Sequence, residues 1–276
     1  MNCEPQFIDL DKVIKDKAPK LYKRLPRLAI NYLKRKIHID ELNEILTIYA
    51  DRDGVDFMTS VVGYFNLKLD IKGLENIPED GRFIFSSNHP LGGLDGICLS
   101  AIIGEKYNHK IKYQVNDILL NIKNLQSIFI PVNKVGKQSK KIAAQVNEAF
   151  ESDNQIITFP AGLCSRKING KIYDLDWKKN FIQKAIETKR DIVPVYFKGQ
   201  NSNFFYRFAN IRKSLGIKFN IEMLFLPDEM FKNRNETFSI IFGKPIPYSI
   251  FDNTRNTVQW AEFMREQTYN LAKTDK

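Results

Sequence analysis

The chain has 276 residues, of which 43% are hydrophobic and 27% are charged. This balance is typical of a folded globular protein and excludes a disordered or collagen-like chain. Lys and Arg number 42 against 32 Asp and Glu, so the net charge is +10. The surplus favours polyanionic partners without deciding between nucleic acid and anionic lipid.

Cysteine spacing and apolar segments narrow the protein classes further. The cysteines Cys3, Cys98 and Cys164 form no CxxC pair, so neither a disulfide framework nor a metal site is indicated, and we expect reduced, inert thiols. The longest apolar stretch, Gly96 to Gly104, is far shorter than the ~18 residues that a membrane-spanning helix needs. The N-terminal sequence is acidic and lacks the apolar core of a secretory signal. We therefore expect a cytoplasmic protein.

Positive charge is concentrated near the N-terminus. Between Lys12 and Lys36 lie ten basic residues and one acid, Asp16, which together make up almost the whole surplus. Apolar residues recur there at helical spacing, although Pro26 argues against one unbroken helix. These apolar residues are Tyr22, Leu25, Ala29, Tyr32 and Leu33. Such a helix could lie on the inner face of an anionic membrane. It could equally be a solvated cap that packs its apolar stripe on the core, and the sequence leaves both possibilities open.

After this stretch the sequence predicts a helix over Asp40–Tyr49, and the apolar period changes near Tyr64. Alternation at Phe65, Leu67, Leu69 and Ile71 predicts a strand. Strands and helices then alternate: Arg82–Ser86 before Gly96–Glu105, Lys110–Val115 before a short helix, Ser127–Val132 before Ser139–Phe150, Gln155–Phe159 before Lys178–Thr188, and finally Ile192–Phe197. We expect an α/β fold with a mainly parallel central sheet flanked by helices over residues 61–276, preceded by a basic helical extension over residues 1–60.

The first of three loops at predicted strand ends carries the strongest chemical signal. Ligands of parallel sheets bind outside the carboxyl ends of the strands, and the loop after Arg82–Ser86 contains His89 and Asp95. A histidine can accept a proton near neutral pH, and a nearby carboxylate can orient it. We therefore expect His89 to act as a catalytic base with Asp95 as its partner, although a structural Asx turn would also explain the loop. His38 and His109 lie among lysines and are expected to be solvated.

Two further loops offer groups that bind anions. In Phe159–Lys167, Gly162 allows backbone N–H groups to approach an anion, and Arg166 supplies positive charge. The third loop, Ile130–Lys134, ends in another cation, which an ordinary exposed lysine would equally explain. Each of these signals is weak alone.

Taken together, the loops resemble the conserved blocks of the glycerolipid acyltransferase superfamily, which includes 1-acylglycerol-3-phosphate O-acyltransferases. The matching segments, in family order, are Asn88-His89…Asp95, Ile128–Lys134, Phe159-Pro160-Ala161-Gly162…Ser165-Arg166, Val193-Pro194-Val195 and the tail Phe242–Ile246. The resemblance covers Tyr64 to Ile246, and the order of the blocks makes it more specific than any single block.

The sequence departs from the family pattern at three points. Five residues separate His89 from Asp95, one more than is usual, and Ala161 stands where the family carries Glu. Asn133 or Lys134 replaces the usual Arg of the second block. The His-Pro-x-Gly-Gly and Phe-Pro-Ala-Gly variants resemble a hemolysin-like subgroup that includes lyso-ornithine and glycine lipid O-acyltransferases, which favours an acceptor without a phosphate monoester.

The resemblance implies transfer of a fatty acyl group from a thioester of acyl carrier protein or coenzyme A to the hydroxyl of a lysolipid. The acceptor would be a lyso-aminolipid or lysophosphatidic acid, and no bound cofactor is implied. His89 would take the hydroxyl proton and Asp95 would stabilise the imidazolium, while backbone N–H groups around Gly162 are candidate oxyanion donors. The expected substrate-binding residues are Asn88, Lys134, Phe159, Pro160, Gly162, Ser165 and Arg166.

Two other classes remain as alternatives. A thioesterase or lipid hydrolase would use water in place of the lipid hydroxyl, and Ser86 and Ser87 lie beside His89, but the chain has no GxSxG motif. A nucleic-acid-binding protein would explain the basic stretch but would leave the His89 loop without a role, and no zinc finger or RNP motif is present. We therefore expect a lipid partner and no nucleic acid.

Overall fold

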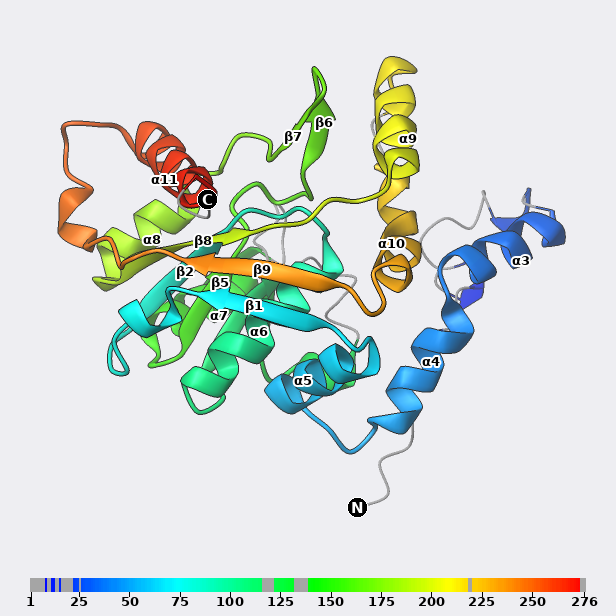
Figure 1. The fold of residues 1–276 in the computed structure, drawn as a ribbon, viewed down its shortest axis with the longest axis horizontal. Helices are drawn as coiled ribbons and strands as arrows, with labels where there is room; N and C mark the ends of the chain where they lie inside the picture. The colour runs from blue at the N-terminus through cyan, green and yellow to red at the C-terminus, as the bar shows by residue number, and fades with distance from the viewer. Residues whose placement is uncertain are drawn as a thin grey trace.

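A seven-stranded sheet forms the centre of the computed structural model, which describes residues 26–115, 122–131, 139–217 and 220–273, together with 8, 11, 12, 15 and 22–24 (Figure 1). The strands, in spatial order, are β1 (Lys68–Lys72), β9 (Thr237–Phe242), β8 (Asp191–Phe197), β2 (Phe83–Ser87), β5 (Gln155–Thr158), β3 (Ile111–Val115) and β4 (Phe129–Pro131). Every neighbouring pair is parallel except β8 with β9. The predicted α/β fold with a mainly parallel sheet is confirmed.

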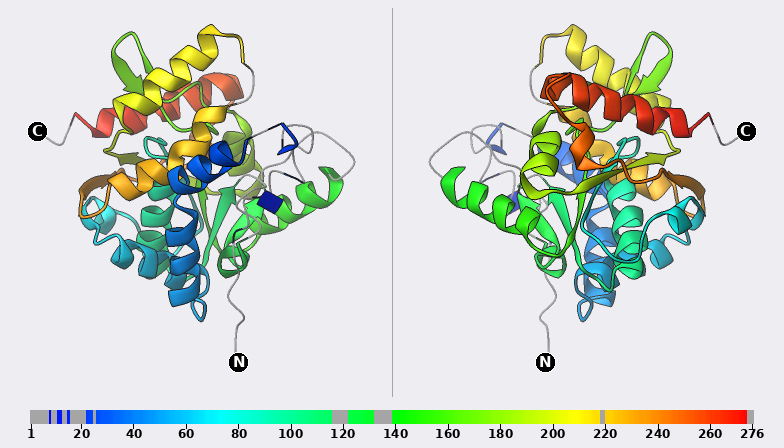
Figure 2. Two further views of the ribbon diagram at one scale, coloured as in Figure 1. Left: turned by 90° about the vertical axis from the view of Figure 1, so that its right-hand side faces the viewer. Right: turned by 90° about the vertical axis from the view of Figure 1, so that its left-hand side faces the viewer.

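Helices cover both faces of the sheet because its strands alternate apolar residues toward both sides (Figures 1 and 2). Phe83 and Phe85 of β2 pack in the core that includes α5 (Gly54–Tyr64) and α6 (Gly93–Lys106). Ile84 packs on the opposite side in the core of α7 (Ser139–Glu151), α8 (Asn180–Thr188) and α11 (Thr257–Leu271). Such double-sided burial is what parallel sheets require.

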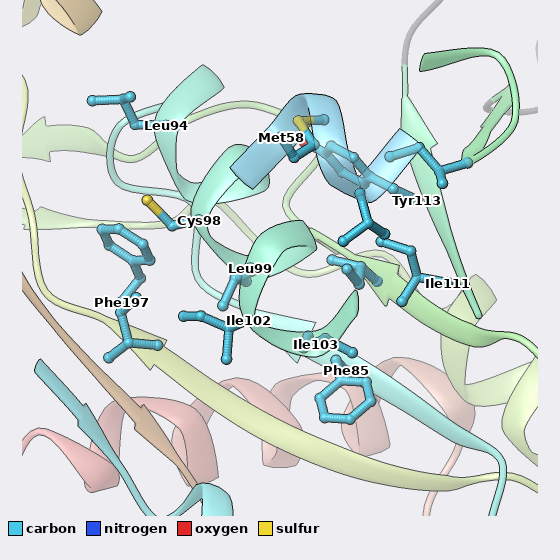
Figure 3. Close-up of a cluster of buried hydrophobic side chains, with 14 of the residues drawn as sticks. Met58, Phe85, Leu94, Cys98, Leu99, Ile102, Ile103, Ile111, Tyr113 and Phe197 are labelled. Atoms are coloured by element: carbon cyan, nitrogen blue, oxygen red, sulfur yellow. The ribbon is translucent and has the colours of Figure 1, made fainter. Parts of the chain in front are cut away.

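The buried helix α6 anchors the first of these two cores (Figure 3). Its sequence is apolar around most of its circumference, since it packs against both the sheet and α5. Leu94, Leu99 and Ile103 are fully buried, together with Phe85 and Phe197 of the sheet. Burying one such side chain contributes about 1.5–3 kcal/mol. The first turn of α6 is therefore rigidly placed beside the end of β2.

Several elements differ from the sequence prediction at their ends. The N-terminal basic helix α3 (Arg27–Lys36) begins after Pro26, whose backbone is extended, and α4 (Ile39–Ile48) follows directly. Helix α6 begins at Gly93 and not at Gly96, which places Asp95 in its first turn. The predicted boundary at residues 60 and 61 falls inside α5, which packs in the core.

The expectation that His38 is solvated is wrong. Its left-handed backbone separates α3 from α4, and its ring stacks on Phe231 at 4.3 Å. Its Nδ1 and Nε2 lie within 2.9 Å and 3.3 Å of carboxylate oxygens of Glu41 and Asp228, respectively. His109 is exposed, as expected. His38 is thus a structural contact between the N-terminal helices α3 and α4 and helix α10 (Leu226–Lys232).

Other elements were not predicted. A hairpin of β6 (Arg166–Ile168) and β7 (Lys171–Tyr173) follows β5, and α9 (Asn203–Ser214) follows β8. The remaining short helices are η1 (Leu74–Asn76), η3 (Lys123–Leu125), η4 (Ile221–Phe225) and η5 (Tyr248–Ile250). Among the described helices none is long and apolar enough to cross a bilayer.

Candidate active site

The two predicted catalytic side chains meet at the carboxyl end of β2. His89 follows this strand by two residues, and its Nδ1 lies 3.0 Å from Oδ2 of Asp95. The same oxygen accepts the Leu91 N–H at 3.1 Å. Gly92 has a φ of 84°, a conformation that suits glycine and lets the chain turn back into α6. The extra residue between His89 and Asp95 is therefore accommodated in this turn.

This geometry defines which nitrogen of His89 can act as a base. Asp95 is fully buried, whereas the His89 side chain keeps 13% of its surface exposed. When Nδ1–H donates to Asp95, Nε2 carries the lone pair that can accept a proton. The carboxylate then stabilises the imidazolium that forms.

Phe159 fixes the plane of the His89 ring. The two rings stack with centroids 4.1 Å apart and an angle of 30° between their planes. Phe159 in turn makes an edge-to-face contact with Tyr113, with the two ring centroids 5.6 Å apart. Since Phe159 opens the Phe-Pro-Ala-Gly turn, this turn lies against the imidazole, as the order of the motifs predicts.

The backbone of His89 is held from both sides by groups far along the chain. Its carbonyl accepts the Ser165 N–H at 2.7 Å, and its own N–H donates to Oδ1 of Asp174 at 3.2 Å. The Ser165 hydroxyl donates to the same Asp174 oxygen at 2.6 Å. Ser165, expected to bind substrate, therefore holds the loop that contains His89 in this structure.

Asp174 is a site residue that the sequence analysis missed, because it belongs to none of the resembling blocks. It is fully buried, and its Oδ2 accepts from the Trp177 indole at 2.9 Å. Its backbone N–H donates to the Tyr269 hydroxyl at 2.8 Å. Burial raises the pKa of Asp174, and the hydrogen bonds from Ser165 and Trp177 offset part of that rise.

Asn88, another expected substrate ligand, is engaged by the sheet. Its amide nitrogen donates to the Phe197 carbonyl at 2.9 Å, and its amide oxygen accepts the Phe197 N–H at 2.7 Å. Asn88 is buried. These two bonds connect the end of β2 to the end of β8 and so position the next residue, His89.

The turn around Gly162 is closed by its own backbone. The Gly162 N–H donates to the Phe159 carbonyl at 2.9 Å, and the Pro160 carbonyl accepts the Lys178 N–H at 3.0 Å. Gly162 itself is exposed with a φ of 70°, and the Lys178 ammonium group lies beside it, 2.6 Å from where a Cβ would stand. The Gly162 N–H thus has an internal acceptor, while the Lys178 cation next to the turn was not predicted.

Arg166 lies in β6 and has protein partners. One guanidinium nitrogen donates to Glu222 at 2.9 Å, and another donates to the Cys164 carbonyl at 2.7 Å. Glu222 is fully buried and forms a second ion pair with Arg212 at 2.7 Å. Arg166 is therefore tied to η4 and is not extended toward His89. Lys134, the other expected cation, lies outside the described residues.

Alternative nucleophiles are unfavourably placed. Ser86 and Ser87 are fully buried, and the Ser87 hydroxyl donates to the Asn88 carbonyl. Burial raises the pKa of the Cys164 thiol to about 11 and raises that of Cys98 even more strongly. Both thiols are therefore protonated at neutral pH. Within the described ranges, no group of three His, Cys, Asp or Glu side chains is arranged to hold a metal ion.

The candidate site thus combines a buried carboxylate that orients a histidine at the end of a parallel strand with a Phe-Pro-Ala-Gly turn beside the imidazole. The chain belongs to the acyltransferase family, whose model matches residues 12–275. The resemblance inferred from the motifs is thereby confirmed, and the protein is an acyltransferase.

Curated relatives match almost the whole chain. It is 51% identical over 265 residues to the lyso-glycine lipid O-acyltransferase of Bacteroides thetaiotaomicron, covering 96% of this chain and 97% of that one. The lyso-glycine lipid O-acyltransferase of Phocaeicola vulgatus is 52% identical over 265 residues, with 96% and 95% covered. The fold is shared with the 1-acyl-sn-glycerophosphate acyltransferase PlsC of Thermotoga maritima at a TM-score of 0.52 and 14% identity, covering 90% of this chain and 88% of that one.

Proposed function

We propose that this protein is a lysolipid O-acyltransferase whose acceptor is a lyso-glycine lipid or a closely related lyso-aminolipid. The observation that carries the proposal is the His89–Asp95 pair, in which Asp95 holds Nδ1 and leaves Nε2 as the base. The acceptor class is supported by the names of the two relatives, which are 51% and 52% identical to this chain.

In the proposed reaction, Nε2 of His89 takes the proton of the acceptor hydroxyl. The hydroxyl oxygen then attacks the thioester carbonyl carbon and forms the ester bond as the carbon–sulfur bond breaks. The departing thiolate takes the proton from the imidazolium, so the histidine is regenerated and no acyl-enzyme forms. General-base catalysis of this kind contributes typically about 10²–10⁴ in rate.

The donor and the membrane contact belong to the same proposal. The acyl group comes from a thioester of acyl carrier protein or coenzyme A, without a bound cofactor. Phe159 stacks on the imidazole, and we assign Phe159, Pro160 and Gly162 of its turn to substrate binding. The basic helix α3, with Arg27 at its start and Lys34 to Lys36 at its end, contacts anionic lipid at the inner face of the cytoplasmic membrane.

Product analysis tests the proposal directly. The purified protein is incubated with labelled acyl-coenzyme A or acyl carrier protein thioester and with lyso-glycine lipid, lyso-ornithine lipid or lysophosphatidic acid. We expect mass spectrometry to detect the acylated glycine lipid, and His89→Ala to lower its formation at least about 100-fold. The matched control is His109→Ala, which removes an exposed histidine.

Two outcomes would overturn this scheme. Release of free fatty acid without acylated acceptor would identify a thioesterase. Near wild-type acyl transfer by His89→Ala would show that this imidazole is not the base.

A further inference from the structure

Helix α9 carries an apolar stripe that the fold covers only in part, through contacts of Phe204 and Phe208 with Phe225. Phe204, Ile211 and Leu215 are 49%, 55% and 69% exposed, and their spacing places them on one face of the helix. Phe208 lies on the same face and stacks on Phe204 at 5.9 Å. The inner face of α9 is already packed, with Phe205, Tyr206 and Ala209 buried. Contiguous exposed apolar side chains of this size mark interaction sites.

The exposed charges of α9 are all positive. Arg207 and Lys213 are exposed on α9, and the segment from Asn203 to Ile217 contains no Asp or Glu. On α10, Lys232 places its ammonium group 6.0 Å from the centre of the Phe204 ring. The acidic residues that follow along the chain, Glu222, Asp228 and Glu229, are buried. A partner of this face therefore has to combine an apolar layer with negative charge.

Helix α3 lies on the same side of the molecule as α9 and α10, as the left view of Figure 2 shows, and it carries exposed apolar and basic residues of its own. Leu28 is 83% exposed and Tyr32 is 48% exposed, one helical turn apart. Arg27 and Arg35 are exposed beside them, and α3 contains no acid. Helix α10 links the two helices, since its Asp228 pairs with Lys36 of α3 at 3.4 Å and its Lys232 lies against the Phe204 ring of α9.

The segment that leads into α9 contacts the catalytic loop. Helix α9 follows β8, the neighbour of β2 in the sheet. The Asn201 amide donates to the Pro90 carbonyl at 3.2 Å, one residue after His89. Whatever binds α9 is therefore brought to the edge of the sheet at which the imidazole lies.

We propose that α9 and α3 together form a docking face for an anionic lipid bilayer. The apolar side chains of both helices enter the interfacial layer, and the flanking Arg and Lys residues contact lipid phosphates. A bilayer fits better than an acidic carrier protein, because one extended surface can receive large apolar groups from two separate helices. The inference rests on the proposed function, since a lysolipid acceptor resides in the membrane.

Vesicle binding without any acyl donor tests this face. The full chain is sedimented with vesicles of phosphatidylglycerol and phosphatidylcholine, or of phosphatidylcholine alone. We expect binding to the anionic vesicles only, and a loss of about tenfold or more for the triple variant Phe204→Ser, Ile211→Ser, Leu215→Ser. The double variant Arg207→Glu, Lys213→Glu should lose binding as well. The matched control is Ile186→Ser, Val258→Ser, which removes exposed apolar residues of α8 and α11 and should bind as wild type does.

Activity assays separate this inference from the proposed function. With an acceptor presented in detergent micelles, the triple variant should retain wild-type acyl transfer, and with acceptor in anionic vesicles it should lose activity in parallel with binding. Wild-type vesicle binding by the triple variant overturns the inference. If the triple variant binds vesicles as wild type does and also has a raised KM for acyl carrier protein, the inference is likewise overturned and the face is assigned to the acyl donor. Absence of acyl transfer by the wild type would refute the proposed function and leave the vesicle result standing.

Discussion

Asp174 holds the backbone of His89 through the 3.2 Å hydrogen bond that its Oδ1 accepts from the histidine N–H. Because the same oxygen accepts from Ser165, and Ser165 in turn donates to the His89 carbonyl, one buried carboxylate orders the peptide groups on both sides of the imidazole. Asp174 does not touch the ring, so it is a positioning residue.

Asp174→Asn should lower kcat while leaving KM for both substrates nearly unchanged. The new amide has one acceptor oxygen and one NH₂ group. Its NH₂ group therefore faces a hydrogen-bond donor, either the Trp177 indole N–H or the Ser165 and His89 donors. Loss of such a hydrogen bond to a buried charged group costs about 1.5–3 kcal/mol of unfolding free energy. Steady-state kinetics and urea unfolding measure the two effects. Asp176→Asn, at an exposed position two residues away, should change neither, and a raised KM in Asp174→Asn would contradict a positioning role.

The same variant should change how stability depends on pH. Burial raises the folded-state pKa of Asp174 above 3.8, so the folded protein binds this proton more tightly than the unfolded chain does. This contribution to the unfolding free energy is full below pH 3.8 and is lost as the pH rises through the folded-state pKa. The stability of wild type relative to Asp174→Asn should therefore fall with rising pH over that window. Urea unfolding at a series of pH values measures the difference, and a rise would contradict the assignment.

Arg166 offers a test between structural and substrate-binding roles. Arg166→Met leaves the buried Glu222 with Arg212 as its remaining ion-pair partner, and breaking one side of a buried pair costs about 3 kcal/mol. We expect a clear loss of stability in thermal unfolding. The double variant Arg166→Met, Glu222→Gln should recover part of it. Unchanged stability together with a raised KM for the acceptor would instead identify Arg166 as a substrate ligand.

Gly96 should tolerate no side chain. A Cβ there would stand 2.3 Å from the Tyr113 hydroxyl, and Tyr113 packs on Phe159, which stacks on His89. Gly96→Ala should therefore cost about 1–3 kcal/mol and lower kcat by shifting Phe159. Gly63 lies in α5 with no atom within 4 Å of its Cβ position, so Gly63→Ala should stabilise the protein by about 0.5–1 kcal/mol. Thermal unfolding of the two variants makes the comparison, and equal stability of both would contradict it.

The buried thiols should have no part in acyl transfer. With the pKa of Cys164 raised to about 11, only a small fraction of that thiol is ionised at neutral pH. Cys98→Ala and Cys164→Ala should keep wild-type kcat, at a stability cost of about 1 kcal/mol each. Mass spectrometry of the intact protein during turnover should show no acylated enzyme. A thiol-linked acyl group at either position would contradict direct transfer.

Local patterns were enough to locate the central strands and to predict that His89 and Asp95 meet. Buried parallel strands contain runs of Ile, Val and Phe, and β2, β5 and β8 were each found within a residue or two. His89 and Asp95 are only six residues apart, so their proximity could be inferred from the glycines between them. The start of helix α6 at Gly93 could not be inferred from the sequence, because it depends on the packing of α6 in the core.

Contacts between distant residues were beyond this kind of prediction. Asp174 binds a backbone group 85 residues away, and the pairing of Arg166 with Glu222 spans 56 residues. Strand β9 begins at Thr237, before the tail that resembles the closing strand, because its pairing partners are β1 and β8. Nothing near these residues in the sequence indicates their partners.

The reciprocal hydrogen bonds of Asn88 restrict which residue can precede His89. Its side chain both donates to and accepts from Phe197, so it imitates one peptide unit that continues the pairing of β2 with β8. Aspartate at this position would offer acceptors alone and leave the Phe197 carbonyl without its donor, while glutamine would be longer by one methylene. A primary amide of this length is therefore a stereochemical requirement of the loop: a side chain that mimics main chain sets the height of the imidazole above the sheet.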